Sequence, residues 1–375
     1  MPRGLGWALA ATGLIALLLA VALAPGAAKS AAGQNWPAFV LVTGLLLLGL
    51  VARHDGLFDA GGELVARSAR GGYSLLAWCA GLVAVVTAVL NLDTAVAFLT
   101  PVLVLAARRR KTDETAFLYL AVFLANGASL LLPGSNLTNL IVLGDRPISG
   151  GAFAATMLPA WLAASVSVTV VIALVFRRRL GRAGPRARRP LEARLGVGLT
   201  GVAIAVVAMV VLSGGTLALC VLATGTVTVG LRLGRGRLAW PEVRRTIDLP
   251  ILAGLFGLGV ALGALGRSWS GPAWLLAHAS SWQAAGVGAA TSVVSNNLPA
   301  ASLLAARPPP DPYALLIGLN LGPNLAVSGA LSVLLWAQAA RPLGARPSAV
   351  RYTQLGLVVV PVSMAAALGA LALTR

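Results

Sequence analysis

Two polar clusters interrupt apolar stretches in opposite halves of this chain of 375 residues. Residues Gly134–Asn139 read Gly-Ser-Asn-Leu-Thr-Asn, and residues Ser295–Pro299 read Ser-Asn-Asn-Leu-Pro. Both clusters combine helix-breaking residues with amide and hydroxyl side chains. Inside a membrane, unpaired backbone groups are tolerated only where protein or a water-filled cavity satisfies them. A matched pair of such interruptions therefore points to the binding site of a secondary transporter.

Two further polar groups, Asn91–Thr94 and Asn320–Asn324, break apolar stretches in the same way. Broken helices attract anions at their N-terminal ends and coordinate cations through unwound carbonyls. Asn, Ser and Thr side chains add donors and acceptors without net charge. Such a site suits a small polyhydroxylated solute, an oxyanion or a weakly held ion. The predicted substrate-binding residues are Asn91, Thr94, Ser135, Asn136, Thr138, Asn139, Ser295, Asn296, Asn297, Asn320 and Asn324.

Asp93 is the one acid placed well inside an apolar stretch. A charge at the bilayer centre costs about 2.5–3.5 kcal/mol on insertion scales, so such residues are functional by default. We expect Asp93 to carry a coupling proton or to bind a coupling ion. The alternative is a helix cap, because Asp followed by Thr is a normal helix start. Capping is also the alternative for Asn296 and Asn297.

The composition is that of an integral membrane protein. Apolar residues make up 58% and charged residues only 11%, and the mean hydropathy is +0.86. A soluble domain carries about a quarter charged residues. The net charge of +18 does not indicate nucleic-acid binding, because the basic residues lie in tight clusters between apolar spans. These clusters, which mark cytoplasmic loops, are Arg108–Lys111, Arg177–Arg194, Arg232–Arg245 and Arg341–Arg351.

Placing the basic clusters in the cytoplasm gives a cytoplasmic N-terminus and a multi-pass protein of the inner (plasma) membrane. Leu5–Ala24 crosses outward, Trp36–Ala52 returns, and 53–70 forms a surface helix. A polar-tipped stretch, a broken span and a final span follow, and the second half repeats this order. The first stretch, 73–107, is either a re-entrant hairpin or a pair of spans, whereas 283–306 is too short for two spans.

The two halves have opposite predicted orientations, because the first hairpin opens from the inside and the second from the outside. The predicted fold is therefore an all-α membrane protein with an inverted-topology repeat, two re-entrant hairpins and two broken transmembrane helices. We predict that residues 1–190 form the first half, including a leading helix, and residues 191–375 the second.

Other chemistry finds little support in the sequence. Cys79, Cys220, His54 and His278 are isolated, which predicts no metal site. The remaining acids, Asp55 among them, fall in predicted loops or at surfaces. There is no phosphate loop, no Ser/His/Asp set and no large soluble domain. We therefore expect no enzyme activity and no cofactor, and keep a non-transport membrane enzyme or scaffold as a remote alternative.

At these positions the chain resembles the arsenite permease family (arsenical pump membrane proteins). This family belongs to a wider ion transporter superfamily that includes sodium/proton antiporters and di- and tricarboxylate carriers. The likeness begins near Arg53 and covers most of the chain from there. It rests on Asn91–Ala95 with Leu99–Pro101, Asn126–Leu130 through Ser135–Leu140, Ser295–Pro299 and Asn320–Asn324.

The resemblance implies efflux of a small inorganic solute, arsenite or antimonite, driven by a proton gradient or the membrane potential. Neutral, hydroxyl-rich arsenite suits a cavity of amides and hydroxyls. The alternative is a sodium/proton antiporter or an organic-anion carrier of the same fold, so the coupling ion is a proton or sodium. Asn126, Asn320 and Asn324 depart from the charged residues that the family often has there. The resemblance also allows a homodimer in the lipid bilayer.

Overall fold

The computed structural model describes residues 3–144, 146, 148–181 and 196–374, and within them every regular element is helical. In this described part, seven helices are long and apolar enough to cross a membrane. The all-α prediction is confirmed. The predicted boundary between the halves, at 190/191, lies outside the described residues.

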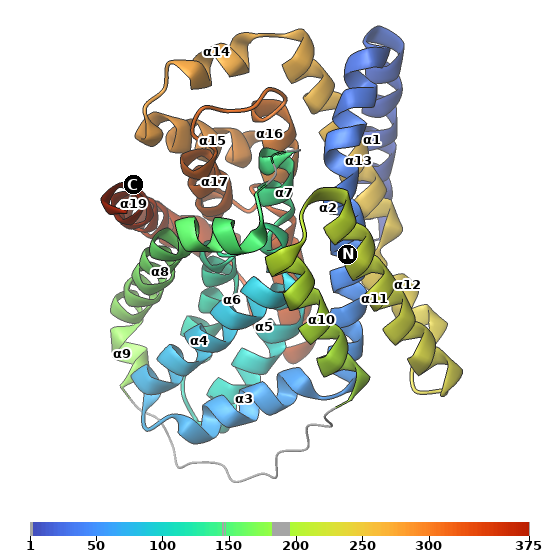
Figure 1. The fold of residues 1–375 in the computed structure, drawn as a ribbon. Helices are drawn as coiled ribbons and strands as arrows, with labels where there is room; N and C mark the ends of the chain where they lie inside the picture. The colour runs from blue at the N-terminus through green and yellow to red at the C-terminus, as the bar shows by residue number, and fades with distance from the viewer. Residues whose placement is uncertain (1–2, 145, 147, 182–195, 375) are drawn as a thin grey trace.

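The N-terminal part begins with long apolar helices and then breaks into shorter ones (Figure 1). Its elements are α1 (Arg3–Leu23), α2 (Pro25–His54), α3 (Leu57–Ser68), α4 (Gly72–Leu90), α5 (Leu92–Arg109), α6 (Thr115–Ala128), the 3-10 turn η1 (Pro133–Ser135), α7 (Leu137–Leu143), α8 (Gly150–Val175) and α9 (Arg177–Leu180).

The C-terminal part follows the same plan after one additional helix, α10. Its elements are α10 (Val197–Val211), α11 (Gly214–Gly234), α12 (Trp240–Ile247), α13 (Leu249–Ser268), α14 (Gly271–Ala277), α15 (Ser281–Ser295), α16 (Asn297–Leu304), α17 (Pro312–Leu321), η2 (Gly322–Leu325), α18 (Leu331–Ala340), η3 (Arg341–Leu343) and α19 (Ala349–Leu373).

Five successive units of the two parts correspond in order. The span α2, surface helix α3, hairpin α4–α5, broken helix α6–η1–α7 and span α8 match α13, α14, α15–α16, α17–η2–α18 and α19. The packing is reciprocal, because α2 lies on α13, α8 on α19, α5 on α18 and α7 on α16. The leading helices cross over, α1 packing on α13 and α11 on α2 (Figure 1).

One predicted element differs from the structure, and one of the two alternatives given for the first hairpin is favoured. The span predicted over 36–52 is the longer helix α2, which begins with Pro25 in its first turn and runs through Pro37. The arms of the first hairpin, α4 and α5, are 19 and 18 residues long, or about 28 and 27 Å. Their length would allow two crossings, but the tip residue Asn91 is only 1% exposed and therefore lies inside the protein.

Small residues bring the helices into close contact. A side chain at Gly318 of α17 would place its Cβ 2.0 Å from the carbonyl oxygen of Ala285 on α15. Gly13 and Gly254 meet in the same way between α1 and α13. Small residues at helix crossings let backbones approach, and the resulting van der Waals packing drives helix association in lipid.

A buried ion pair joins three helices on the side of the protein away from α7 and α16. The Asp55 carboxylate accepts hydrogen bonds from the Arg232 guanidinium and, at 2.9 Å, from the backbone N–H of Gly198. Both charged side chains are less than 10% exposed. Asp55 lies in the turn between α2 and α3, as predicted for a loop residue, but it is buried because α11 extends through Arg232 and covers it.

Candidate functional site

The two broken helices meet through their amide side chains. Asn320, at the end of α17, accepts hydrogen bonds from Asn136 Nδ2 at 2.6 Å and from Thr138 Oγ1 at 2.7 Å. Its own Nδ2 donates to Asn139 Oδ1 at 2.8 Å. All four side chains are at most 2% exposed. The polar breaks predicted from opposite halves of the sequence therefore lie against each other.

The helix breaks themselves explain several of these bonds. The break between α6 and α7 leaves backbone carbonyls without helical partners. Asn139 Nδ2 donates to one of them, Ser129 O, at 2.8 Å, and also to Leu132 O at 3.0 Å, which accepts from Ser135 N as well. In the other break, Asn324 Nδ2 donates to Phe123 O at 3.1 Å, and Asn324 Oδ1 accepts from Asn126 at 2.8 Å.

These side chains form two sets joined by Ser129 Oγ, which donates to the main-chain carbonyl of Asn126 at 2.8 Å, and we call the whole buried assembly the amide network. It comprises Asn126, Ser129, Asn136, Thr138, Asn139, Asn320, Asn324 and Tyr352. None of these residues carries a formal charge, although they come from both halves of the chain. The donors and acceptors of this assembly could also form hydrogen bonds with an incoming hydroxyl or oxygen, in exchange for those between the amides.

The first hairpin tip lies beside the amide network. Asn91 Oδ1 caps α5 by accepting from the backbone N–H of Thr94 at 2.8 Å, and Ser135 Oγ donates to Ala88 O at 3.0 Å. The Asn91 backbone, at φ 97° and ψ 167°, adopts a conformation found almost only in glycine. Such strain is characteristic of binding and switch regions.

Several buried polar atoms near this tip have no hydrogen-bond partner. They include Asn91 Nδ2, Thr94 Oγ1 and Thr87 Oγ1 around the tip, and Asn126 Oδ1 in the amide network. Buried polar groups in folded proteins are normally paired with protein or ordered water. Unpaired groups gathered at one tip are therefore available to a solute or to water.

The second hairpin tip is more exposed and stands apart from the amide network. Ser295 Oγ donates to Thr291 O of its own helix at 2.9 Å. Asn296 caps α16 with a 3.3 Å bond to Leu298 N, and its backbone is strained in the same sense as Asn91, at φ 73° and ψ 150°. Asn297 is buried, and its backbone N–H donates to Gly329 O at 2.9 Å.

Asp93 faces a cavity of about 170 Å³ that we call the inner cavity. Arg245 and Asp248, at the end of α12, line one part of it. Leu137, the first residue of α7, and Leu298, the second residue of α16, line the other part. Within the described residues, the structure gives the Asp93 carboxylate no hydrogen bond or ion pair. The acid is therefore free to exchange a proton or bind a cation through this cavity.

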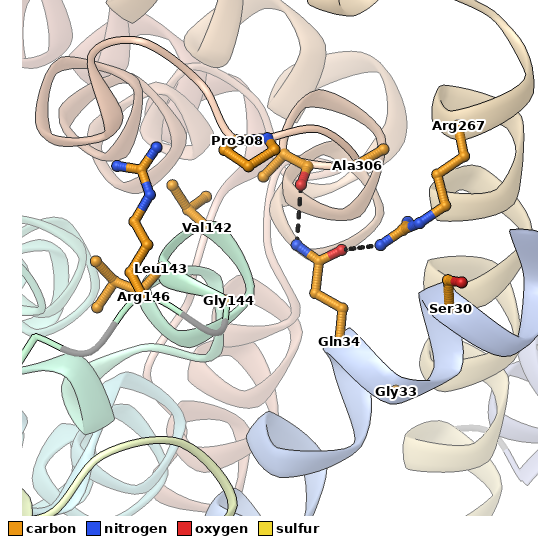
Figure 2. Close-up of a pocket in the computed structure, with 11 residues that line it drawn as sticks. Ser30, Gly33, Gln34, Val142, Leu143, Gly144, Arg146, Arg267, Ala306 and Pro308 are labelled. Atoms are coloured by element: carbon orange, nitrogen blue, oxygen red, sulfur yellow. Dashed lines mark hydrogen bonds between the residues drawn. The ribbon is translucent and has the colours of Figure 1, made fainter.

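A second cavity, of about 690 Å³, lies at the opposite ends of α7 and α16, and we call it the outer cavity (Figure 2). Gln34 of α2 reaches its middle, and its Nε2 donates to Ile141 O at 2.7 Å and Ala305 O at 2.9 Å. Arg267 of α13 donates to Gln34 Oε1 at 2.7 Å. Arg146 also lines this cavity and donates to Pro309 O.

Two short helices separate the two cavities. Helix α7 has seven residues and α16 has eight, or about 10 and 12 Å of helix. Leu137 at the start of α7 lines the inner cavity, whereas Val142 and Leu143 at its end line the outer one. The same holds for Leu298 and Ala305 at the two ends of the α16 segment. A solute crossing the protein would have to pass this pair of helices.

The predicted site residues thus fall into four places: the two hairpin tips, the amide network and the inner cavity. Ser135 joins the first hairpin tip to the break, and Asp93 lines the inner cavity. The buried amide network contains Asn136, Thr138, Asn139, Asn320 and Asn324. Asn91 and Thr94 lie at the first tip, and Ser295, Asn296 and Asn297 at the second.

Sequence reasoning did not assign a site role to Gln34, Ser129, Tyr352 or Arg267. Gln34 and Arg267 flank predicted spans, where polar residues are common. Asn126, an amide within an apolar helix, carried a usable signal. No group of three or more His, Cys, Asp and Glu side chains that could hold a metal ion occurs in the described part of the chain.

A sequence profile described as citrate transporter matches residues 5–339. The chain belongs to this family of transporters. It is also 28% identical to the arsenical pump membrane protein of Escherichia coli K12 over 370 residues, covering 89% of this chain and 86% of that protein. The uncharacterized transporter Mb2703 of Mycobacterium bovis is 26% identical over 373 residues, covering 89% and 85%. The predicted resemblance to the arsenite permeases is confirmed.

The fold is also similar to a solved structure, that of the YdaH transporter of Alcanivorax borkumensis, which has an unusual topology. The TM-score is 0.54 at 17% identity, and the alignment covers 98% of this chain and 97% of that one. This likeness concerns the fold. Together with the family match, it identifies the chain as a multi-pass membrane transporter.

Proposed function

We propose that this transporter exports arsenite or antimonite in exchange for protons. The observation that carries the proposal is the amide network, a buried set of uncharged donors and acceptors from both halves. Neutral arsenite presents three hydroxyl groups, each able to donate and accept. Asn136, Thr138 and Asn320 would exchange their mutual hydrogen bonds for bonds to these hydroxyls. The arsenical pump membrane proteins among the relatives support this substrate class.

In this proposal Asp93 couples export to the proton gradient. Its carboxylate borders the inner cavity at the first turn of α5, two residues from the tip Asn91. A proton taken up at the outer face would be released from Asp93 into the inner cavity before the next solute binds. An uncharged, protonated Asp93 crosses the apolar barrier at less cost than a carboxylate. Sodium is the alternative coupling ion, and a sodium gradient in the same assay separates the two.

We further propose that the protein lies in the inner membrane with its N-terminus in the cytoplasm. The basic residues of α9 and α12 and of the turn after α5 then face the cytoplasm, as the positive-inside rule requires. The inner cavity, which ends at Arg245 and Asp248, opens on that side. A homodimer remains a prediction.

The first test measures arsenite uptake into everted membrane vesicles that are energised with a proton gradient. The second measures the cellular arsenic content of an arsenite-sensitive strain that lacks its own exporter and expresses this chain. We expect the wild-type chain to lower cellular arsenic and to fill the vesicles. Asn136→Ala should weaken transport, whereas Asn296→Ala, which alters the tip outside the amide network, should weaken it much less. Unchanged cellular arsenic with normally inserted wild-type protein would overturn the proposal.

An organic-anion carrier is the second candidate, and one feature of the outer cavity favours it. Arg146 and Arg267 both line this cavity, and no acidic side chain is among its described lining residues. A guanidinium fork binds a carboxylate in two places. The name of the family profile, citrate transporter, points the same way. Uptake of labelled citrate into right-side-out vesicles, abolished by Arg267→Gln, would favour this function over arsenite export.

A further inference from the structure

Two adjacent residues of α2 hold both short helices that separate the cavities. Gln34 Nε2 donates to Ile141 O of α7 and to Ala305 O, immediately after α16. The next residue, Asn35, accepts from Ser302 Oγ of α16 at 2.9 Å. These bonds connect α2 to α7 and α16, at the ends of the two short helices that face the outer cavity.

The chemistry of this contact follows from helix ends. The last carbonyls of a helix lack partners within the helix, and they carry the negative end of its dipole. One amide, Gln34 Nε2, satisfies a carbonyl near the end of each short helix, and Figure 2 shows the bond on the α16 side. Arg267 holds the other end of the same side chain, at Oε1, and places a positive charge beside the two helix ends.

We propose that Gln34, oriented by Arg267, is a latch that holds α7 and α16 in the arrangement seen here. In this arrangement the inner cavity reaches Asp93, and the short helices close the path to the outer cavity. Release of the latch lets α7 and α16 move relative to α2 and α13, which exposes the site to the outer face. This inference rests on the proposed function, in that it assigns Gln34 a positioning role in transport.

The latch is built to open at little cost. Gln34 is only part-buried and lines a cavity of about 690 Å³, so water can replace each of its hydrogen bonds as it breaks. The amide network differs, because its side chains are at most 2% exposed. A movement that keeps the amide network intact and replaces the Gln34 hydrogen bonds with bonds to water should therefore cost less than a movement that breaks the amide network.

The test measures from which face a reporter cysteine can be reached. Cys79 and Cys220 are replaced by alanine, and Leu298→Cys places a thiol at the first turn of α16, lining the inner cavity. A membrane-impermeant maleimide is applied to right-side-out and to everted vesicles. The ratio of the two labelling rates reports which cavity reaches the barrier, and it requires no substrate.

Gln34→Ala should raise the outer-to-inner labelling ratio roughly tenfold, because two net hydrogen bonds of the observed arrangement are lost. Gln34→Glu should raise it as well, because a carboxylate keeps its contact with Arg267 but has no hydrogen for the two carbonyls. The matched control is Gln338→Ala, which removes the same amide from the inner cavity and should leave the ratio unchanged.

A wild-type ratio in Gln34→Glu, a near-isosteric variant expected to insert normally, would overturn the latch even if Gln34→Ala fails to insert. A rise in Gln34→Ala alone would also reject the role given to the two carbonyls. The outcome is independent of the substrate, since arsenite transport can be absent while the ratio changes. Conversely, arsenite transport with an unchanged ratio would reject the latch and leave the proposed function standing.

Discussion

Replacing Asn320 by alanine tests how strongly the amide network joins the two halves. The change removes three hydrogen bonds, two accepted from Asn136 and Thr138 and one donated to Asn139. Hydrogen bonds between helices in a bilayer contribute about 0.6 kcal/mol each, which gives a loss of about 2 kcal/mol. The Thr138 hydroxyl and Asn139 Oδ1 also lose their cross-repeat partner, at about 1–3 kcal/mol for each orphaned group. The sum of these terms is a loss of about 4–8 kcal/mol.

The measurement is the free energy of unfolding in mixed micelles, followed by tryptophan fluorescence as a denaturing detergent is added. The chain has nine tryptophans to report it. Asn296→Ala is the matched control, because it removes the same amide from the part-exposed second tip and should cost about 0.5–2 kcal/mol, the usual effect of losing a helix cap. If Asn320→Ala were no more destabilising than Asn296→Ala, the network would not hold the halves together.

Three other changes have defined outcomes. Asp93→Asn should abolish proton-driven transport in everted vesicles while the protein still inserts, and transport at the wild-type rate would remove Asp93 from the coupling mechanism. Asp55→Ala should destabilise the protein by about 3–5 kcal/mol, because the Arg232 charge stays buried without its partner; thermal unfolding of the purified protein measures this, and full stability would contradict it. Gly318→Val should destabilise the protein by about 1–3 kcal/mol or more in the same measurement, because its Cβ alone would lie 2.0 Å from Ala285 O. The control is Gly286→Val, which has open space at its Cβ and should cost less than about 1 kcal/mol.

The helix breaks could be predicted because their signals are local. A glycine or proline beside amides within an apolar run ends a helix wherever the run lies, so Gly134–Asn139 and Asn320–Asn324 were recognisable in isolation. Charge clusters then set the order of the spans. The meeting of Asn320 with Asn136 depends on packing between residues that are 184 positions apart. Hydropathy carries no information about such pairs.

The misjudged features have a common physical origin. Gln34 and Asn35 made the start of α2 look too polar for a span, yet Gln34 donates to Ile141 O of α7 and Asn35 Oδ1 accepts from Ser302 of α16. Arg232 looked like part of a loop because it stands beside other arginines, but α11 continues through it and pairs it with Asp55. In both cases a polar group is tolerated at depth because a distant part of the chain supplies its partner.

The crossed leading helices bear on how the protein is made. Helix α1 packs chiefly on α13, which begins at residue 249, and α11 packs on α2. At about 5–20 residues per second, α1 waits roughly 10–45 s in the bilayer before its neighbour is synthesised. It can wait there because nearly its whole circumference suits lipid, with only 11% of its apolar window buried in the finished protein. The packing of α1 therefore forms late, after α13 of the second half has been synthesised and inserted.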